Sequence, residues 1–203
     1  MSIPLPTRFS FSPLALLFLA SAILAGCGST PTSEFFVLTP RLGAEDQLAV
    51  PLFKVGLQPI VLPAEVNRAQ MIFNVAPHQR HVAEFTRWAS PLADNITRVI
   101  EQNLEGSLGR SSVYRHPARL SPPLDYLLLI EILQFDSKID GPCELRARFH
   151  LAGPTGKWIT SETFRSSSEG QSGGPAGVAE AMSKNLGQLS DAIAARARAS
   201  HGS

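Results

Sequence analysis

Cys27 is the residue whose chemistry the chain indicates most directly. It closes the tetrapeptide Leu24-Ala25-Gly26-Cys27, which matches a bacterial lipobox, and it follows an apolar run at residues 14–24 and one basic residue, Arg8. This layout is typical of a secretory signal, and the run is shorter than the roughly 20 residues that a membrane-spanning helix needs. We therefore predict that residues 1–26 are a cleaved signal peptide and that Cys27 is lipidated. The alternative is an ordinary secretory signal with an incidental cysteine.

The residues after Cys27 predict where the anchored protein is located. Each buried methylene contributes about 0.8 kcal/mol and one acyl chain alone binds only marginally, so the three chains of a lipoprotein form a practically permanent anchor. Gly28 and Ser29 stand where an aspartate would favour retention in the inner membrane of enteric-type Gram-negative bacteria. We expect an outer-membrane protein on the periplasmic face. Residues 27–33 are small, polar and interrupted by proline, which favours a flexible tether over an ordered arm.

Composition limits what the mature part of the chain can be. Removing residues 1–26 from the 203 leaves 177 residues, enough for one domain, and such a domain buries roughly 70% of its unfolded surface without needing disulfides or metals. Cys143 then has no cysteine to pair with, and we expect a buried, unreactive side chain. The whole chain has 18 basic and 17 acidic residues, a balance that argues against a nucleic-acid partner.

Strand patterns rich in aromatic and β-branched residues precede the first helical pattern. They predict strands at residues 34–39 and 53–62, and a hairpin of strands 70–75 and 80–85 around the loop 76–79. Pro59 has no amide hydrogen to donate, so an edge position or a bulge is expected there.

Two amphipathic helices are predicted. In the first, Ser90 is placed to cap the helix, Pro91 suits the first turn, Asp94 lies near the positive end of the dipole and Gly109 ends it. Apolar residues recur on one face of each helix at spacings of three and four, or multiples of four. They are Leu92, Ile96, Val99, Ile100, Leu104 and Leu108 in the first, and Val178, Met182, Leu186, Leu189 and Ile193 in the second.

Three more strands are expected between the helices. Residues 124–135 are strongly apolar, which predicts a strand covered on both faces, whereas residues 143–151 alternate and predict one wet face. The turn 153–156 leads to a strand at 157–165, followed by a loop at 166–174. These elements predict an α+β fold for residues 34–200, with a mostly antiparallel sheet and both long amphipathic helices packed on one face.

We find no set of residues that predicts catalysis, a metal or a cofactor. His78 and His81 lie in a hairpin rather than on a helix, so solvated side chains are favoured over a metal pair. Nucleophile-elbow, P-loop and dinucleotide motifs are absent, and the glycine-rich residues 170–177 favour a flexible loop. Glu131 lies within an apolar strand, where burial would raise its pKa; the alternative is a position at the sheet rim or beside an arginine.

Three stretches resemble the ABC-type transport auxiliary lipoproteins, the PqiC-like family that accompanies MCE-protein lipid transport systems. They are residues 55–70 (VGLQPIVLPAEVNRAQ), 83–92 (AEFTRWASPL) and 181–194 (AMSKNLGQLSDAIA), and residues 35–38 (FFVL) are similar to the family's opening strand. The order is that of the family and spans nearly the whole mature chain. Ser90 and Phe36 depart from the family's pattern, standing where the family often has an acid and a tyrosine.

The resemblance implies a non-enzymatic outer-membrane lipoprotein that docks a periplasmic MCE tunnel to the outer membrane. The implied partners are the MCE-domain protein and its inner-membrane transporter component, and a homo-oligomer around the end of the tunnel is compatible with this arrangement. Two alternatives remain open: a structural lipoprotein of another outer-membrane assembly or secretion complex, and a periplasmic hydrolase with an unrecognised site.

Arg68, Gln70, Arg87 and Trp88 belong to the family-like stretches but do not continue the apolar stripe of the first helix. We interpret them as residues that bind a partner or organise the turn into that helix. The alternative is local packing and hydrogen bonding alone.

Overall fold

The computed structural model describes residues 31–41, 53–118, 120 and 122–202. Its elements, in chain order, are β1 (Glu34–Phe36), β2 (Val55–Leu57), β3 (Gln70–Ala76), β4 (Gln79–Trp88), α2 (Leu92–Leu108), β5 (Val113–Arg115), β6 (Tyr126–Ser137), β7 (Cys143–Ala152), β8 (Trp158–Ser168) and α3 (Gly174–His201). Cys27 and the signal peptide lie outside the described residues.

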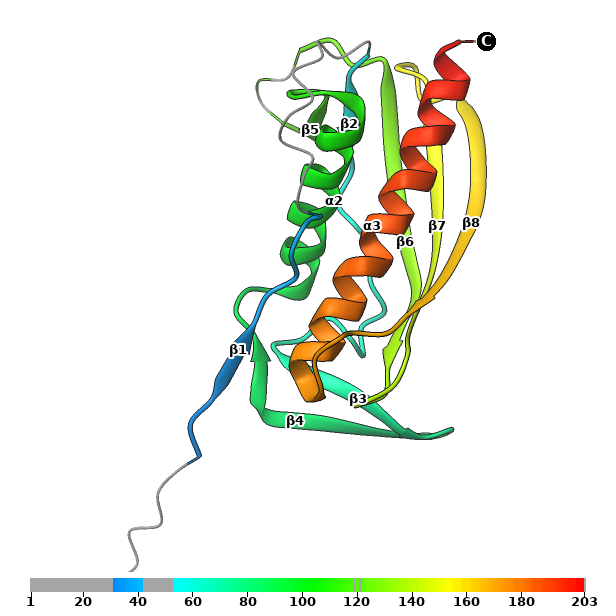
Figure 1. Ribbon diagram of the computed structural model, residues 1–203. Coiled ribbons are helices and arrows are strands. Elements are labelled where there is room, and N and C mark those ends of the chain that lie inside the picture. The colour runs from blue at the N-terminus through cyan, green and yellow to red at the C-terminus, as the bar shows by residue number, and fades with distance from the viewer. Residues whose placement is uncertain (1–30, 42–52, 119, 121, 203) are drawn as a thin grey trace, which may run out of the picture. The chain divides into compact units, whose positions relative to one another are not determined.

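A five-stranded sheet in the order β5-β2-β6-β7-β8 forms the main layer, and α2 and α3 lie together on one of its faces (Figure 1). The α+β fold with two helices on one face is therefore confirmed. β6, β7 and β8 form an antiparallel meander, which agrees with the mostly antiparallel sheet predicted, but β2 runs parallel to both β5 and β6. The parallel pairs arise because the chain crosses over through α2 before β5 is added beside β2.

The core lies between this sheet and the two helices. Every second residue of β7 is fully buried, from Cys143 to Leu151, while the intervening residues face outward. All predicted apolar residues of the two helices are buried except Leu108, which is partly buried. Burial of these stripes is what fixes both helices on the sheet, since the stripe of each helix otherwise faces water.

The start of α2 differs from the prediction. Pro91, rather than Ser90, occupies the cap position, and no side chain donates or accepts a capping hydrogen bond there. Pro91 still supplies the cap geometry, because its carbonyl accepts the amide hydrogen of Asn95 at 3.0 Å. Gly109 ends the helix as predicted, with a positive φ of 105° and its amide donating to Glu105.

A second, three-stranded sheet in the order β1-β4-β3 was not expected as a separate layer. β3 and β4 form the predicted hairpin, and β1 pairs in parallel with the last residues of β4, from Glu34 beside Thr86 to Phe36 beside Trp88. Between the Gln70–Arg87 pair and the Met71–Ala83 pair the register shifts, so β4 bends out of the hairpin toward β1. Because of this bend, β4 pairs with β3 along the hairpin and with β1 at its last three residues.

Several strand boundaries and faces also differ from the prediction. β6 alternates between buried and half-buried residues, so it is covered on one face and not on both. Residues 53–62 form only a three-residue strand, because Pro59 cannot donate to the ladder and interrupts it. Beyond Pro59, Val61 makes only an isolated bridge to Glu131. β8 continues to Ser168, so the loop predicted at 166–174 is shorter, and β5 was missed.

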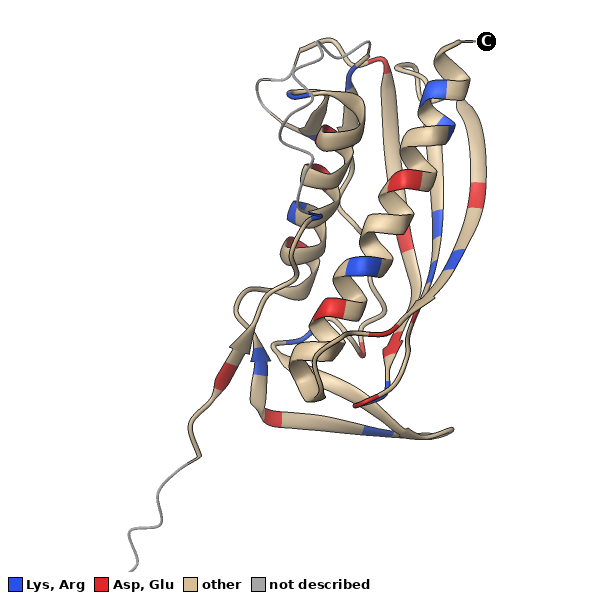
Figure 2. Cartoon of the chain, in the orientation of Figure 1, with Lys and Arg blue, Asp and Glu red and all other residues tan. Residues whose placement is uncertain are grey.

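Charges of both signs are distributed over all the layers, as Figure 2 shows. Among the residues described, none of the helices is both long and apolar enough to cross a bilayer.

Candidate functional site

The structure brings Gln70, Arg87 and Trp88 together at the corner where β1, β3 and β4 meet. Gln70 and Arg87 are paired across β3 and β4, and Arg87 and Trp88 also pair with β1. Arg68 lies in the turn just before β3, where its amide donates to the carbonyl of Val66 at 2.9 Å. The sequence prediction therefore selected residues that are neighbours in the fold.

Trp88 is part of the core and only 5% exposed. Its amide donates to the carbonyl of Ala69 at 2.8 Å, and the next amide, of Ala89, donates to Phe36 at 2.8 Å. The ring borders a void of about 10 Å³ shared with Leu92 and Met182, which holds at most one water, so packing around it is tight. Trp88 thus joins the three-stranded sheet to the start of α2 and to α3.

Arg87 and Arg68 are the accessible members of this set. The Arg87 Nε donates to the carbonyl of Glu84 at 2.8 Å, and its guanidinium lies 3.9 Å from the Glu84 carboxylate. These contacts hold Arg87 along the bend of β4. Arg68 is exposed, and Gln70 is half-buried beside Arg87. Arg68 is thus the exposed residue of the set, whereas Arg87 is half-buried and paired with Glu84, and Trp88 is buried beneath them.

A second arrangement, not predicted from the sequence, holds the residues after β1 in the groove between α2 and α3. We call residues 38–41 the strap. Its amides donate to side chains of the two helices: Leu38 to Asn95 Oδ1 at 3.3 Å, Thr39 to Ser183 Oγ at 3.0 Å and Arg41 to Asn103 Oδ1 at 2.9 Å. Leu38 is completely buried. Buried Asn95, Asn103 and Ser183 interrupt the apolar faces of the helices, and this was the only sequence signal for the strap.

Two arginines secure the strap at its ends. Arg98 of α2 donates to the carbonyl of Leu38 at 2.5 Å and to Asn95 Oδ1 at 2.8 Å. Arg41 forms a bidentate pair with Asp191 of α3 at 2.5 and 2.6 Å. Its aliphatic part passes over Gly187, where a β-carbon would lie 3.0 Å from the Arg41 side chain. The strap therefore attaches the segment that follows the predicted tether to both helices.

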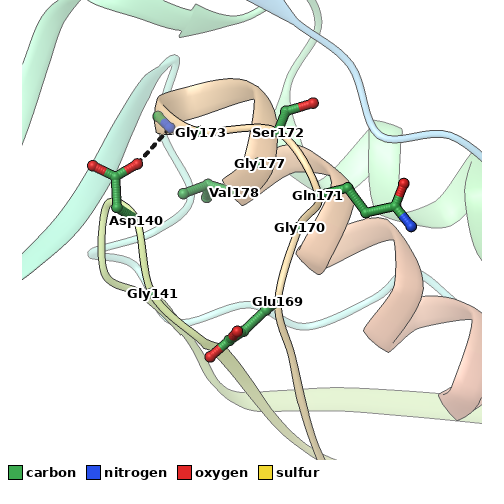
Figure 3. A pocket seen from close by; sticks show the side chains of 10 residues that line it. Asp140, Gly141, Glu169, Gly170, Gln171, Ser172, Gly173, Gly177 and Val178 are labelled. Atoms are coloured by element: carbon green, nitrogen blue, oxygen red, sulfur yellow. Dashed lines mark hydrogen bonds between the residues drawn. The ribbon is translucent and has the colours of Figure 1, made fainter.

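A cavity of about 220 Å³ lies beside the first turn of α3, between the β6–β7 turn and the glycine-rich segment (Figure 3). Three of the backbone donors around it are already used: Gly174 donates to Asp140 at 2.7 Å, and Gln171 and Ser172 donate to Glu180 at 2.7 and 3.0 Å. These hydrogen bonds lower the pKa of Glu180, chiefly through the Ser172 hydroxyl. The acidic Asp140 and Glu169 on its wall disfavour an anion here.

Gly170 and Gly177 are needed for this arrangement. A β-carbon on Gly170 would lie 2.1 Å from the carbonyl oxygen of Gly177, and one on Gly177 would lie 1.9 Å from that of Ser172. Close backbone contact, rather than phosphate binding, accounts for these glycines.

The remaining sequence candidates are placed as follows. Glu131 is partly exposed and pairs with Arg148 at 3.3 Å, which confirms the alternative of an arginine partner. His78 lies in the β3–β4 turn and His81 on β4, both exposed. Within the described ranges, no cluster of three or more His, Cys, Asp or Glu side chains could hold a metal ion. Burial raises the pKa of the Cys143 thiol to about 12, in agreement with the predicted unreactive side chain.

Comparison with known proteins identifies the family. The profile described as "ABC-type transport auxiliary lipoprotein component" matches residues 36–194. A crystal structure of an uncharacterised protein superposes with a TM-score of 0.66 at 18% identity, covering 82% of this chain and 99% of that one. A crystal structure from Xanthomonas campestris, of a protein in the family DUF330, gives 0.68 at 17% identity, covering 84% and 97%.

The two crystal structures confirm the fold alone at these identities. The PelC dodecamer from Paraburkholderia phytofirmans aligns at a TM-score of only 0.40 and 15% identity over 75% of this chain and 90% of that one, too distant to support an argument. No curated protein matches the chain. Because the profile match runs from β1 to the last third of α3, the chain belongs to the family of ABC-type transport auxiliary lipoprotein components.

Proposed function

We propose that this protein is a non-enzymatic outer-membrane lipoprotein that docks the periplasmic end of an MCE-type lipid transport system to the outer membrane. The observation that carries the proposal is the family match over residues 36–194, which includes all of α2, α3 up to Ala194, and all the strands except the first two residues of β1. A shielded route through such a system has a physical advantage, since each lipid methylene exposed to water costs about 0.8 kcal/mol.

The anchor in this proposal is Cys27, on the outer membrane's periplasmic face. Only residues 28–33 separate it from β1, and the strap then fixes the chain to both helices. The folded part would therefore stay close to the lipid surface. Its partners would be the MCE-domain protein and, through it, the inner-membrane transporter component; Arg68 and Arg87 are the accessible residues of the β1/β3/β4 corner and are proposed as contacts.

Crosslinking in intact cells, followed by mass spectrometry of the captured partners, tests the docking role. We expect the MCE-domain protein among the partners and increased outer-membrane permeability in the deletion strain. Recovery of only unrelated assembly factors, with the MCE protein expressed and unlinked, would instead support a structural lipoprotein of another assembly.

Cys27→Ser tests the anchor separately. The variant should fold normally, because residue 27 precedes the folded part, but it should no longer incorporate radiolabelled palmitate or fractionate with membranes. Continued palmitate labelling of the variant would show that the lipobox interpretation is wrong.

A further inference from the structure

Five of the nine large apolar side chains that are exposed among the described residues come from separate elements at one end of the fold. They are Phe35 of β1 at 64% exposure, Val37 just after it at 49%, Val75 of β3 at 61%, Phe85 of β4 at 43% and Ile139 of the β6–β7 turn at 49%. Single exposed apolar residues are normal on a protein surface. A group of such residues from β1, the β3–β4 hairpin and the β6–β7 turn is typical of a surface that binds a partner or a membrane.

Contacts between these elements show that they adjoin one another. Arg80 of the β3–β4 hairpin pairs with Asp136 near the end of β6 at 3.6 Å. Asp140 of the β6–β7 turn accepts the amide of Gly174 at the start of α3, and Phe35 and Val37 line a shallow groove with Ala179 of the same helix. Figure 1 shows β1, the hairpin and the β6–β7 turn at the same end of the described fold. We call this the hairpin end.

The hairpin end is also the end at which the chain leads back to Cys27. Seven peptide units join Cys27 to Glu34, so the first strand can lie at most about 25 Å from the anchored cysteine. The anchor thus keeps the hairpin end at a high effective concentration beside the lipid, and even weak apolar contacts suffice for it to stay there.

We propose that the hairpin end rests on the lipid surface that holds the anchor, with Phe35, Val75 and Phe85 entering the headgroup region. This inference rests on the lipid anchor of the proposed function. Burial of aromatic and aliphatic side chains at the boundary of headgroups and acyl chains is favourable. Figure 2 shows an acidic residue on β1 and residues of both signs on β4, and this mixture makes zwitterionic lipid a suitable surface.

The test uses the full chain, processed and lipidated in cells, purified and reconstituted into phosphatidylcholine vesicles. Cys143 is fully buried, so a single introduced cysteine can be labelled with a fluorophore. Val75→Cys places the label at the hairpin end. Trp158→Cys is the matched control: residue 158 is similarly exposed, at 58%, and the β7–β8 register places it at the opposite end of the sheet from Cys143 and the β6–β7 turn.

We expect the label at position 75 to be quenched by nitroxide lipids and shielded from aqueous iodide, and the label at position 158 to behave oppositely. In the Phe35→Ser, Phe85→Ser background, the label at 75 should lose most of its lipid quenching while the protein still floats with the vesicles.

Three results would overturn the proposal. Equal iodide access at positions 75 and 158 on floating protein would reject the lipid contact and leave the anchor intact. Failure to float would reject the anchor and the contact together. Shielding of position 75 in detergent without vesicles, accompanied by a doubled or larger particle mass, would assign the hairpin end to a second copy of this chain.

Discussion

Cys143 is the side chain whose reactivity the fold controls most strongly. It is fully buried on β7 under α3, and its backbone carbonyl accepts a hydrogen bond from Asn185 at 2.8 Å. Desolvation is the largest cause of the rise in its pKa from 9.0 to about 12. The folded protein at pH 8 therefore holds a neutral thiol.

We predict that iodoacetamide leaves Cys143 unmodified in the folded protein at pH 8 and alkylates it after unfolding in guanidinium chloride. Mass spectrometry of the intact chain measures the modification. Rapid alkylation under native conditions would mean that β7 and α3 separate far more readily than their packing indicates.

Trp88 tests the packing of the β1/β3/β4 corner. Trp88→Ala should lower the free energy of unfolding by about 3–5 kcal/mol, because it removes a buried ring from a tightly packed site. Denaturant unfolding measures the change. Trp158→Ala is the control, since that ring is 58% exposed, and it should change stability by only about 0.5 kcal/mol. A stable Trp88→Ala protein that lost its partner would instead assign Trp88 to an interface.

Buried residues were predicted best where the spacing of apolar residues within one helix or strand determines which side chains face the core. The stripes of α2 and α3 and the alternation of β7 follow from spacings within one element. The predicted cap residue, Ser90, was wrong, since Pro91 occupies that position. Both residue types are common at a helix start, and the backbone conformation determines which of them is the cap. The partner of Glu131 depended on the β6–β7 register, which places Arg148 beside it.

At the scale of elements, the strap depends on polar residues buried in the groove between the helices. Asn95 and Asn103 are 1% and 2% exposed, yet their type suggests surface positions. Their role could not be inferred locally, because the amides they accept come from residues about 60 positions earlier in the chain. The strap is therefore a tertiary feature that helical periodicity does not encode.

We predict that Asn95→Ala destabilises the protein by about 1–3 kcal/mol, since it leaves the buried amide of Leu38 without its acceptor. Hydrogen exchange of the Leu38 amide should accelerate more than that of core strands. Gln188→Ala, at an exposed position of α3, should change neither quantity appreciably. Unchanged exchange at Leu38 in the Asn95 variant would show that the strap is held by its other contacts.

The hydrogen bonds that join Glu180 of α3 to Gln171 and Ser172 should depend on pH. Hydrogen bonds from Ser172 and Gln171 lower the pKa of Glu180 below its ordinary value of 4.5. A carboxyl group whose pKa is lower in the folded state stabilises it above the unfolded pKa, and this contribution disappears as the pH falls through the folded pKa. We predict that the amide resonances of Gln171 and Ser172 titrate with a midpoint below pH 4.5, as measured by NMR. Glu180→Gln should abolish this titration; a midpoint at or above 4.5 would contradict the hydrogen-bonded arrangement.

At the scale of the whole molecule, the fold class was predictable and the division into two sheets was not. Hairpins and helices are specified by neighbouring residues, so the β3–β4 and β7–β8 hairpins could be recognised. The parallel pairings of β1 with β4, and of β2 with β5 and β6, join segments distant in the chain. Three-residue strands carry too few side chains to specify such pairings by their own pattern.

The attachment of β1 and the strap has a mechanical consequence for an anchored protein. Tension applied at Ser33 reaches the three-residue ladder between β1 and β4 first, and then the side-chain acceptors that hold the amides of Leu38, Thr39 and Arg41. Those acceptors belong to both α2 and α3, so a pull on the chain is divided between two helices before it reaches the five-stranded sheet. Force transmitted through the proposed anchor at Cys27 would therefore be shared by both helices.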